Sequence, residues 1–163
     1  MTIKIIEYNE MYDEQVKDLL VELQEYVVSI DQDKLSTLSS EYREQYFTYT
    51  KHQTYSQNGK MLLAVVDDNV VGLVAGHIRE YYPVDKLDYT CPKMGVIEEL
   101  IVKNSNRSGG IGKALLKEME SFLKTQGCEY VMLGVFAYNQ KAYDFYKKQN
   151  YNNRMITMLK KMD

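Results

Sequence analysis

The spacing of hydrophobic positions changes along the chain between two periods, one typical of strands and one typical of helices. Alternation over residues 3–8 predicts a short opening strand. Apolar residues three or four positions apart over residues 16–27, and again over 111–123, predict two amphipathic helices. Asn9 is a candidate N-cap for the first of these helices, and Gly127 is placed to end the second.

Apolar runs between and after these helices complete the predicted sheet. Residues 61–66 and 70–75 flank Asp67-Asp68-Asn69, and Asp and Asn tolerate the left-handed backbone that a tight hairpin turn requires. Further strands are predicted over residues 94–102, 130–136 and 151–159, further helices over 39–56 and 139–149, and a loop over 79–92. The order of these elements predicts an α/β protein in which helices flank a single mixed sheet.

Composition limits the class of protein. A chain of 163 residues has the length of one domain, and 45% apolar with 26% charged residues favours a folded core over disorder. The net charge of −3 argues against nucleic-acid binding, which needs an excess of Lys and Arg. No apolar stretch reaches the roughly 20 residues of a membrane span, and residues 1–13 lack the pattern of a signal peptide. We therefore expect a single cytoplasmic domain over residues 1–163, without nucleic acid or membrane as a partner.

The cysteines and histidines do not form a recognisable site in the sequence. Cys91 and Cys128 are too few for a disulfide framework and lack the spacing of metal ligands, so we expect reduced thiols. His52 and His77 stand apart from each other and from the cysteines, which favours surface or packing positions over metal ligation. The sequence therefore predicts no metal.

Residues 98–112 carry the candidate chemistry: a strand with an acidic pair enters a glycine-rich turn, and the turn opens a helix. The first N–H groups of a helix lack intrahelical partners, and glycines let a bulky anion approach the backbone, so this turn is suited to phosphate. The spacing around Lys113 does not fit a P-loop, and Arg107 stands where a dinucleotide fingerprint has glycine. On the glycines alone, an ordinary helix-capping turn stays equally open.

Two motifs in this region resemble those of the GNAT family of N-acetyltransferases. Arg107-x-x-Gly110-x-Gly112 is similar to the family's R/Q-x-x-G-x-G/A turn, and residues 139–146 are similar to its N-x-x-A-x-x-F-Y segment. The resemblance spans nearly the whole chain and implies a mixed, mostly antiparallel sheet flanked by helices. It also implies that the turn's amides hold the diphosphate of acetyl-CoA. The residues expected to bind acetyl-CoA are Leu100, Ile101, Val102, Arg107, Ser108, Gly109, Gly110, Ile111, Gly112, Lys113 and Asn139.

The same resemblance gives three side chains a role in catalysis. Glu98 matches the first carboxylate of an acidic pair that serves as base in the family, and Tyr146 matches the tyrosine that protonates the leaving thiolate. Neighbours on a regular strand face opposite sides, so Glu99 can share the site only if the strand has a bulge, in which case it could hold a cationic substrate. Solvated strand positions for the carboxylates, and a core position for Tyr146, stay open.

These expectations lead to one function and several alternatives. We expect direct acetyl transfer from acetyl-CoA to a primary amine, of a small cationic molecule, in a ternary complex. The alternatives are a protein or peptide amine as acceptor, a non-catalytic acyl-CoA-binding module, or an interaction protein that uses the Tyr-rich segment 42–55. Dimerisation is common in the family, so a homodimer stays open.

Overall fold

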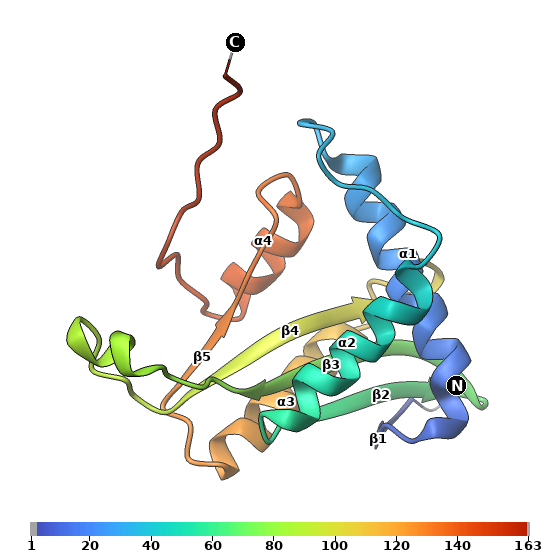
Figure 1. Cartoon of the computed structure of the whole chain (residues 1–163). Coiled ribbons are helices and arrows are strands. Elements are labelled where there is room, and N and C mark those ends of the chain that lie inside the picture. Colours follow the sequence, from blue (N-terminus) through green and yellow to red (C-terminus); the bar gives the residue numbers. More distant parts are fainter. Residues whose placement is uncertain (1–2, 163) are drawn as a thin grey trace.

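The protein forms one five-stranded sheet with helices on both of its faces (Figure 1). A computed structural model describes residues 3–162, so both ends of the predicted 1–163 domain lie outside the described residues. The strands, in spatial order, are β1 (Lys4–Glu7), β2 (Lys60–Val66), β3 (Asn69–Ile78), β4 (Met94–Val102) and β5 (Tyr130–Leu133). The helices are α1 (Asp13–Ile30), α2 (Tyr42–Ser56), α3 (Ile111–Thr125) and α4 (Gln140–Lys148). Three short 3-10 turns are η1 (Glu10–Tyr12), η2 (Pro83–Leu87) and η3 (Asn104–Asn106).

The pairing of the strands confirms the predicted class. The first three pairs, from β1 to β4, are antiparallel, whereas β4 and β5 are parallel, so the sheet is mixed and mostly antiparallel. The predicted hairpin joins β2 to β3 through Asp67 and Asp68, whose φ angles of 47° and 61° are left-handed. Gly127, with φ of 82°, follows α3 as the sequence predicts.

Each face of the sheet has its own hydrophobic core. In Figure 1, α2 passes in front of the strands and α3 behind them. The core under α1 and α2 includes Val16, Leu19, Leu20, Phe47, Leu63, Leu73, Ala75 and Ile101. The core under α3 includes Val74, Ile97, Ile111, Leu115, Leu116, Met119 and Leu123. Apolar side chains on both faces of the central strands therefore hold the two helical layers to the sheet.

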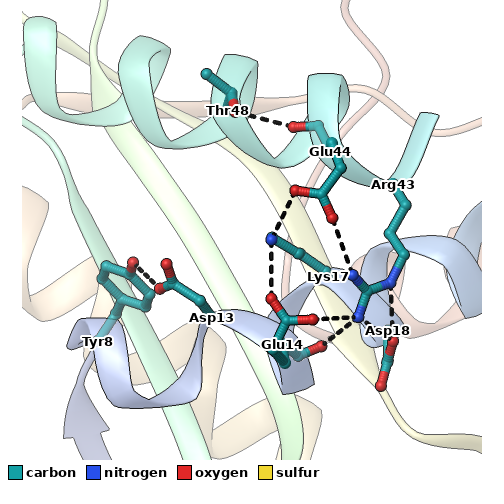
Figure 2. A network of polar contacts seen from close by, with 8 residues as sticks. All are labelled: Tyr8, Asp13, Glu14, Lys17, Asp18, Arg43, Glu44 and Thr48. Carbon is teal, nitrogen blue, oxygen red and sulfur yellow. Dashed lines mark hydrogen bonds and ion pairs between the residues drawn. The ribbon is translucent and has the colours of Figure 1, made fainter. Parts of the chain in front are cut away.

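A network of charged side chains joins α2 to α1 (Figure 2). The guanidinium of Arg43 lies 2.9 Å from Glu14 and 2.8 Å from Asp18, and Lys17 lies 2.7 Å from Glu44. The carboxylates are largely exposed, so each ion pair contributes little to stability. As a network, however, the pairs hold the first turn of α2, which begins with the site residue Tyr42, against α1.

Three predictions need correction. Asn9 caps η1, where its side chain accepts from the amide of Met11, and η1 continues into α1. β5 ends at Leu133 instead of residue 136, where its pairing with β4 ends. The strand predicted over residues 151–159 is absent: apart from Tyr151, whose amide bonds to α4, this segment is extended and exposed, and an apolar pattern makes a strand only beside a ladder partner. The predicted loop over 79–92 contains η2.

Candidate active site

A bulge in the middle of β4 places two adjacent carboxylates on the same face of the sheet. Glu99 pairs with Ala75 and Ile97 with Gly76, so Glu98 is an extra residue without a partner on β3. Both side chains then point toward the α2 side, where Glu98 contacts His77 and Glu99 contacts Tyr46. A shared site for the two glutamates required a bulge in this strand, and the bulge is present.

Glu99 is the buried member of the pair. Its residue is 6% exposed, and the hydroxyl of Tyr46 donates to its Oε1 at 2.5 Å. Burial raises the pKa of Glu99 to about 7, and the negative charge of Glu98 adds to the increase, while the hydrogen bond from Tyr46 opposes it. This carboxyl group therefore changes its protonation state near neutral pH.

Glu98 is the exposed member, and a buried histidine holds it. Its Oε1 lies 2.9 Å from Nε2 of His77, with side-chain exposures of 42% for Glu98 and 5% for His77. The other ring nitrogen, Nδ1, lies 3.3 Å from the carbonyl oxygen of Ile78. Both ring nitrogens therefore face oxygen acceptors, and the one N–H of a neutral imidazole can donate to only one of them. His77 thus has a polar role besides the packing position that its sequence context predicted.

Tyr146 lies on α4, half-buried between other aromatic rings. Its ring centroid is 5.1 Å from that of Phe145 and 5.7 Å from that of Tyr151. Burial raises the pKa of Tyr146 to about 12, and the negative charge of Glu99 contributes to the increase. The phenol therefore keeps its proton at neutral pH, as a proton donor must.

A row of tyrosines on α2 lies beside Glu99, which contacts the middle one, Tyr46. The rings of Tyr42 and Tyr46 stack with centroids 4.6 Å apart, and Tyr49 lies 6.0 Å beyond Tyr46. Burial and the charge on Glu99 raise the pKa values of both Tyr42 and Tyr46, so these phenols stay neutral. Aromatic faces beside carboxylates attract an ammonium group. The helical spacing of these tyrosines was visible in the sequence, but the contact of Tyr46 with Glu99 was not.

The turn after β4 exposes main-chain donors at the start of α3. Gly110, with φ of 80°, is the N-cap of α3, and no side chain caps this end of the helix. A Cβ at Gly110 would meet no atom within 4 Å, and one at Gly109 would meet only a carbonyl oxygen at 3.8 Å. Ser108 also has a positive φ, of 69°. The open turn and the uncapped amides fit a diphosphate group.

A residue of α1 joins the two sequence motifs. The guanidinium of Arg107 lies over the ring of Tyr26 at 5.3 Å, while its Nε donates to the carbonyl of Val102 at 3.0 Å. The hydroxyl of Tyr26 lies 3.5 Å from Oδ1 of Asn139, which also caps α4 by accepting from the amide of Ala142 at 3.2 Å. Nothing in the spacing of α1 pointed to Tyr26, since the contact depends on how the helices pack.

The remaining predicted acetyl-CoA residues lie where β4 leaves β5. The two strands pair only along Met94–Ile97, and Figure 1 shows them diverging beyond that point. Leu100, Ile101 and Val102 therefore extend past the end of β5, and a Cβ on Gly112 would lie 3.5 Å from Val102 and 3.7 Å from Phe145 of α4. Ile111 is buried in the core, whereas Lys113 is exposed on the first turn of α3.

Other parts of the described chain add a depression on α2 but no candidate metal site. Across residues 3–162, no three His, Cys, Asp or Glu side chains gather in a way that could hold a metal ion. A depression of about 460 Å³ on α2 is lined by Glu44, Gln45, Thr48, Tyr49 and His52, and includes neither carboxylate of β4. None of the helices within the described range has the length and apolar content of a membrane span.

Comparison with known proteins identifies the family. Residues 21–151 match the family model described as the Acetyltransferase (GNAT) family. The chain belongs to the GNAT family. Its predicted membership is confirmed, and the coarse activity that follows is acetyl transfer. Comparison with curated proteins found no match.

Solved structures show the same GNAT fold at low sequence identity. A mutant of the BH1408 protein from Bacillus halodurans has a TM-score of 0.83 at 19% identity, covering 99% of each chain. A putative acetyl transferase from Pyrococcus furiosus has a TM-score of 0.71 at 23% identity, covering 99% of this chain and 100% of that one. Glucosamine-6-phosphate N-acetyltransferase from Arabidopsis thaliana has a TM-score of 0.68 at 20% identity, covering all of both chains. At these identities the likeness establishes the fold alone.

Proposed function

We propose that this GNAT protein transfers an acetyl group from acetyl-CoA directly to the primary amine of a small cationic substrate. The observation that carries the proposal is the bulge at Glu98, which puts two carboxylates on one face of β4. Beside them lies Tyr146, whose pKa responds to the charge on Glu99. A base, an acid and an anion-binding turn at the end of the same strand are the groups that acetyl transfer needs.

Glu98 is the proposed proton acceptor. An alkyl ammonium has a pKa of about 10, so the substrate must lose a proton before its nitrogen can attack. The carboxylate of Glu98 is exposed enough for a substrate to approach, and the bond from His77 fixes the orientation of one of its oxygens. The free oxygen then accepts the proton, directly or through a water molecule.

Glu99 is the alternative proton acceptor. Its pKa of about 7 matches a base that works near neutral pH, and it lies against Tyr46. The substrate-holding role expected from the sequence suits this group less well, because a carboxyl that is half protonated at neutral pH attracts an ammonium weakly. The Glu98→Gln and Glu99→Gln variants therefore separate the two assignments.

The transfer step balances with Tyr146 as acid. The neutral amine attacks the acetyl carbonyl carbon, a C–N bond forms, and the C–S bond breaks. The departing thiolate takes the phenolic proton of Tyr146. The substrate nitrogen loses two protons: the first goes from the ammonium to a carboxylate of β4 before the attack, and the second, released as the amide forms, returns to the phenolate of Tyr146 through solvent. The carboxylate then releases its proton to solvent. Cys91 and Cys128 have no place in this scheme, which proceeds without an acyl-enzyme.

The turn and the extended end of β4 are proposed to hold acetyl-CoA as a substrate. Amides of residues 108–113 would bind the diphosphate, with Arg107 and Asn139 beside it. The main chain of Leu100, Ile101 and Val102 pairs with β3 on one side and lies past the end of β5 on the other, where it would pair with the pantetheine amides and supply an N–H to the oxyanion. Support comes from the open space at Gly109 and Gly110 and from the missing side-chain cap of α3.

The acceptor is proposed from charge and aromatic surroundings. Glu98 and Glu99 lie near the stacked rings of Tyr42 and Tyr46, a combination that favours a cation. The Arabidopsis relative is named for a phosphorylated amino sugar as acceptor, but the acidic surroundings here favour an acceptor without an anionic group. A protein or peptide amine is the second candidate, since Glu98 is exposed.

The test combines coenzyme binding with thiol release. Calorimetry should detect acetyl-CoA binding, and an assay for free thiol should show turnover with one class among polyamines, amino acids, aminoglycosides and peptides. Tyr146→Phe should lower the rate about tenfold or more without weakening acetyl-CoA binding. Binding and a higher melting temperature without thiol release from any amine would identify an acyl-CoA-binding module instead. The family match covers residues 21–151, so a single domain over residues 1–163 stays a prediction. The cytoplasmic location also stays a prediction.

A further inference from the structure

One face of α1 carries polar side chains that contact the end of the sheet where β3 begins and β4 ends. Gln15, Glu22 and Tyr26 are seven and four positions apart, so they share this face of the helix. The Oε1 of Gln15 accepts from the amide of Val70 at 2.7 Å, and the Oε1 of Glu22 accepts from the amide of Asn104 at 2.7 Å. These bonds hold α1 against the chain that leads into the turn over residues 107–112, and Tyr26 is the next of the three along this face.

The ring of Tyr26 supports the guanidinium of Arg107. Cζ of Arg107 lies 5.3 Å from the centroid of the ring, within the range of a cation–π contact, and its Nε donates to the carbonyl of Val102 at 3.0 Å. That bond uses one of five N–H groups and does not need the two terminal nitrogens, which form the fork that binds phosphate. Arg107 is exposed, and an exposed arginine without such contacts has much rotamer freedom to lose. The two contacts therefore reduce the entropy that Arg107 loses when it binds an anion.

The hydroxyl of Tyr26 contacts the chain that follows β5. It lies 3.5 Å from Oδ1 of Asn139, the residue that caps α4. A second bond links the same parts of the chain, since the hydroxyl of Tyr138 donates to Oδ2 of Asp33 at 2.9 Å, just beyond the end of α1. Because β4 and β5 pair only along Met94–Ile97, the two strands have separated before the chain reaches these residues. Tyr26 therefore contacts a predicted coenzyme-binding residue on each side of the gap between β4 and β5.

We infer that Tyr26 is a positioning residue for the coenzyme, which holds Arg107 so that the terminal N–H groups of the guanidinium meet the diphosphate on the turn. The inference rests on the proposed function, because the diphosphate site is part of it. An arginine held at Nε and on one face presents its two terminal nitrogens in a fixed plane, as bidentate binding of phosphate requires. The hydroxyl contact with Asn139 is long for a hydrogen bond, so the ring has the larger effect.

Charge gives the fixed position of Arg107 a further consequence. The carboxylate of Glu22 bonds to the amide of Asn104, three residues before Arg107 in the chain. A negative charge near the turn repels a diphosphate, and a guanidinium that is held nearby offsets this repulsion. Loss of the ring of Tyr26 would release the guanidinium into solvent and leave the carboxylate in place.

The first experiment measures the affinity of the intact protein for acetyl-CoA by calorimetry. Tyr26→Leu, which removes the ring, should weaken binding about three- to tenfold. Tyr26→Phe, which keeps the ring and removes only the hydroxyl, should stay within about twofold of wild type. The control Tyr55→Leu removes a partly exposed tyrosine of α2 that packs on Tyr8, and should bind like wild type. Circular dichroism and a cooperative melting transition would show that each variant is folded.

The second experiment asks whether Tyr26 acts through Arg107. In an Arg107→Ala background, Tyr26→Leu should change acetyl-CoA affinity by less than about twofold, since the group that it positions is gone. With Arg107 present, assays of thiol release should show that Tyr26→Leu raises KM for acetyl-CoA and leaves kcat unchanged. With S-acetylpantetheine, a donor that lacks the diphosphate, Tyr26→Leu and wild type should have the same kcat/KM.

The outcomes separate this inference from the proposed function. Wild type that binds no acetyl-CoA would overturn the proposed function, and the inference with it. If wild type binds acetyl-CoA, three results would overturn the inference alone: equal binding by Tyr26→Leu, an equal loss in the Arg107→Ala background, or an equal loss with S-acetylpantetheine. A loss in Tyr26→Phe as large as that in Tyr26→Leu would also overturn it, because the hydroxyl and not the ring would then be responsible.

Discussion

Two regions along β4 form the candidate active site in different ways. At its carboxyl end, the turn over residues 107–112 offers main-chain amides, and its defining feature is the absence of side chains at Gly109 and Gly110. In its middle, the site consists of the side chains of Glu98 and Glu99, each with a partner from another element. One region is specified by local backbone conformation, the other by tertiary contacts.

We expect the two regions to serve different parts of the reaction, the turn binding the coenzyme and the carboxyl pair transferring the proton. Backbone donors at a helix start bind any diphosphate of the right shape and need only glycines and a strand–turn–helix order. Protonation of a carboxyl pair depends on burial and on neighbours such as Tyr46 and His77, which come from α2 and β3. Coenzyme binding should therefore respond to changes in the turn and in the contacts of Arg107, and proton transfer to changes around the pair.

The largest effect is expected for Glu98→Gln. Removing the proposed base should lower kcat/KM for the best amine about 10²- to 10⁴-fold, while calorimetry should find acetyl-CoA affinity close to that of wild type. If Glu99→Gln shows this loss and Glu98→Gln does not, the proton goes to Glu99. If both variants turn over like wild type, the carboxyl pair is not the catalytic centre.

Glu99→Gln should change how stability depends on pH. The pKa of Glu99 is about 7 in the folded protein and 4.5 in an unfolded chain, so between these values the folded state keeps a proton that the unfolded state has released. The free energy of unfolding therefore falls as pH rises through this window, by up to about 3 kcal/mol from this group. Urea unfolding at pH 5 to 8 should show a shallower slope in Glu99→Gln, whereas Glu118→Gln, on the exposed side of α3, should keep it. Parallel curves for wild type and Glu99→Gln would show that Glu99 is ionised throughout.

Gly109→Asp tests the turn independently of the carboxyl pair. A carboxylate there would repel the diphosphate, so acetyl-CoA affinity should fall about tenfold to a hundredfold by calorimetry. Gly109→Ala adds one methyl group at a position where a Cβ meets only a carbonyl oxygen at 3.8 Å, and should lose much less affinity. The melting temperature should not fall in Gly109→Asp, because a negative charge near the start of α3 is favourable. Equal affinities for the two variants would place the diphosphate elsewhere.

The smallest effect is expected for Tyr46→Phe. The hydroxyl of Tyr46 donates to Glu99 and lowers its pKa, so its removal should raise that pKa further. The pH at which the stability slope levels off should move upward, by about one unit at most. Tyr49→Phe is the matched control, since Tyr49 is more exposed and lies beyond Tyr46 on the same helix. A downward shift, or equal shifts in both variants, would contradict the assigned contact.

Much of the fold was predictable because its signals are local. The hairpin at Asp67 and Asp68, the end of α3 before Gly127 and the cap of α4 at Asn139 each depend on a few neighbouring residues. The strand predicted over residues 151–159 had the right composition, but pairing depends on a partner that its own sequence cannot specify.

In the candidate site too, the features with a local signal were predictable, and those that depend on packing were not. The turn and its glycines could be located from spacing, and so could the acidic pair. The bulge that turns both carboxylates to one face depends on the register with β3, and the contacts of His77, Tyr46 and Tyr26 join residues that are 21, 53 and 113 positions apart. Such contacts follow from packing, and no local pattern encodes them.

The extra residue in β4 also determines what a change in the length of this strand would do. Ile97 and Leu100 pack on the α3 side although they are three positions apart, which a regular ladder would not allow. Deleting Glu98 would restore regular alternation, with Ile97 and Leu100 still on the α3 side and a single carboxylate on the α2 side. A natural variant with the shorter strand should therefore keep the same hydrophobic core and lose only the second carboxylate.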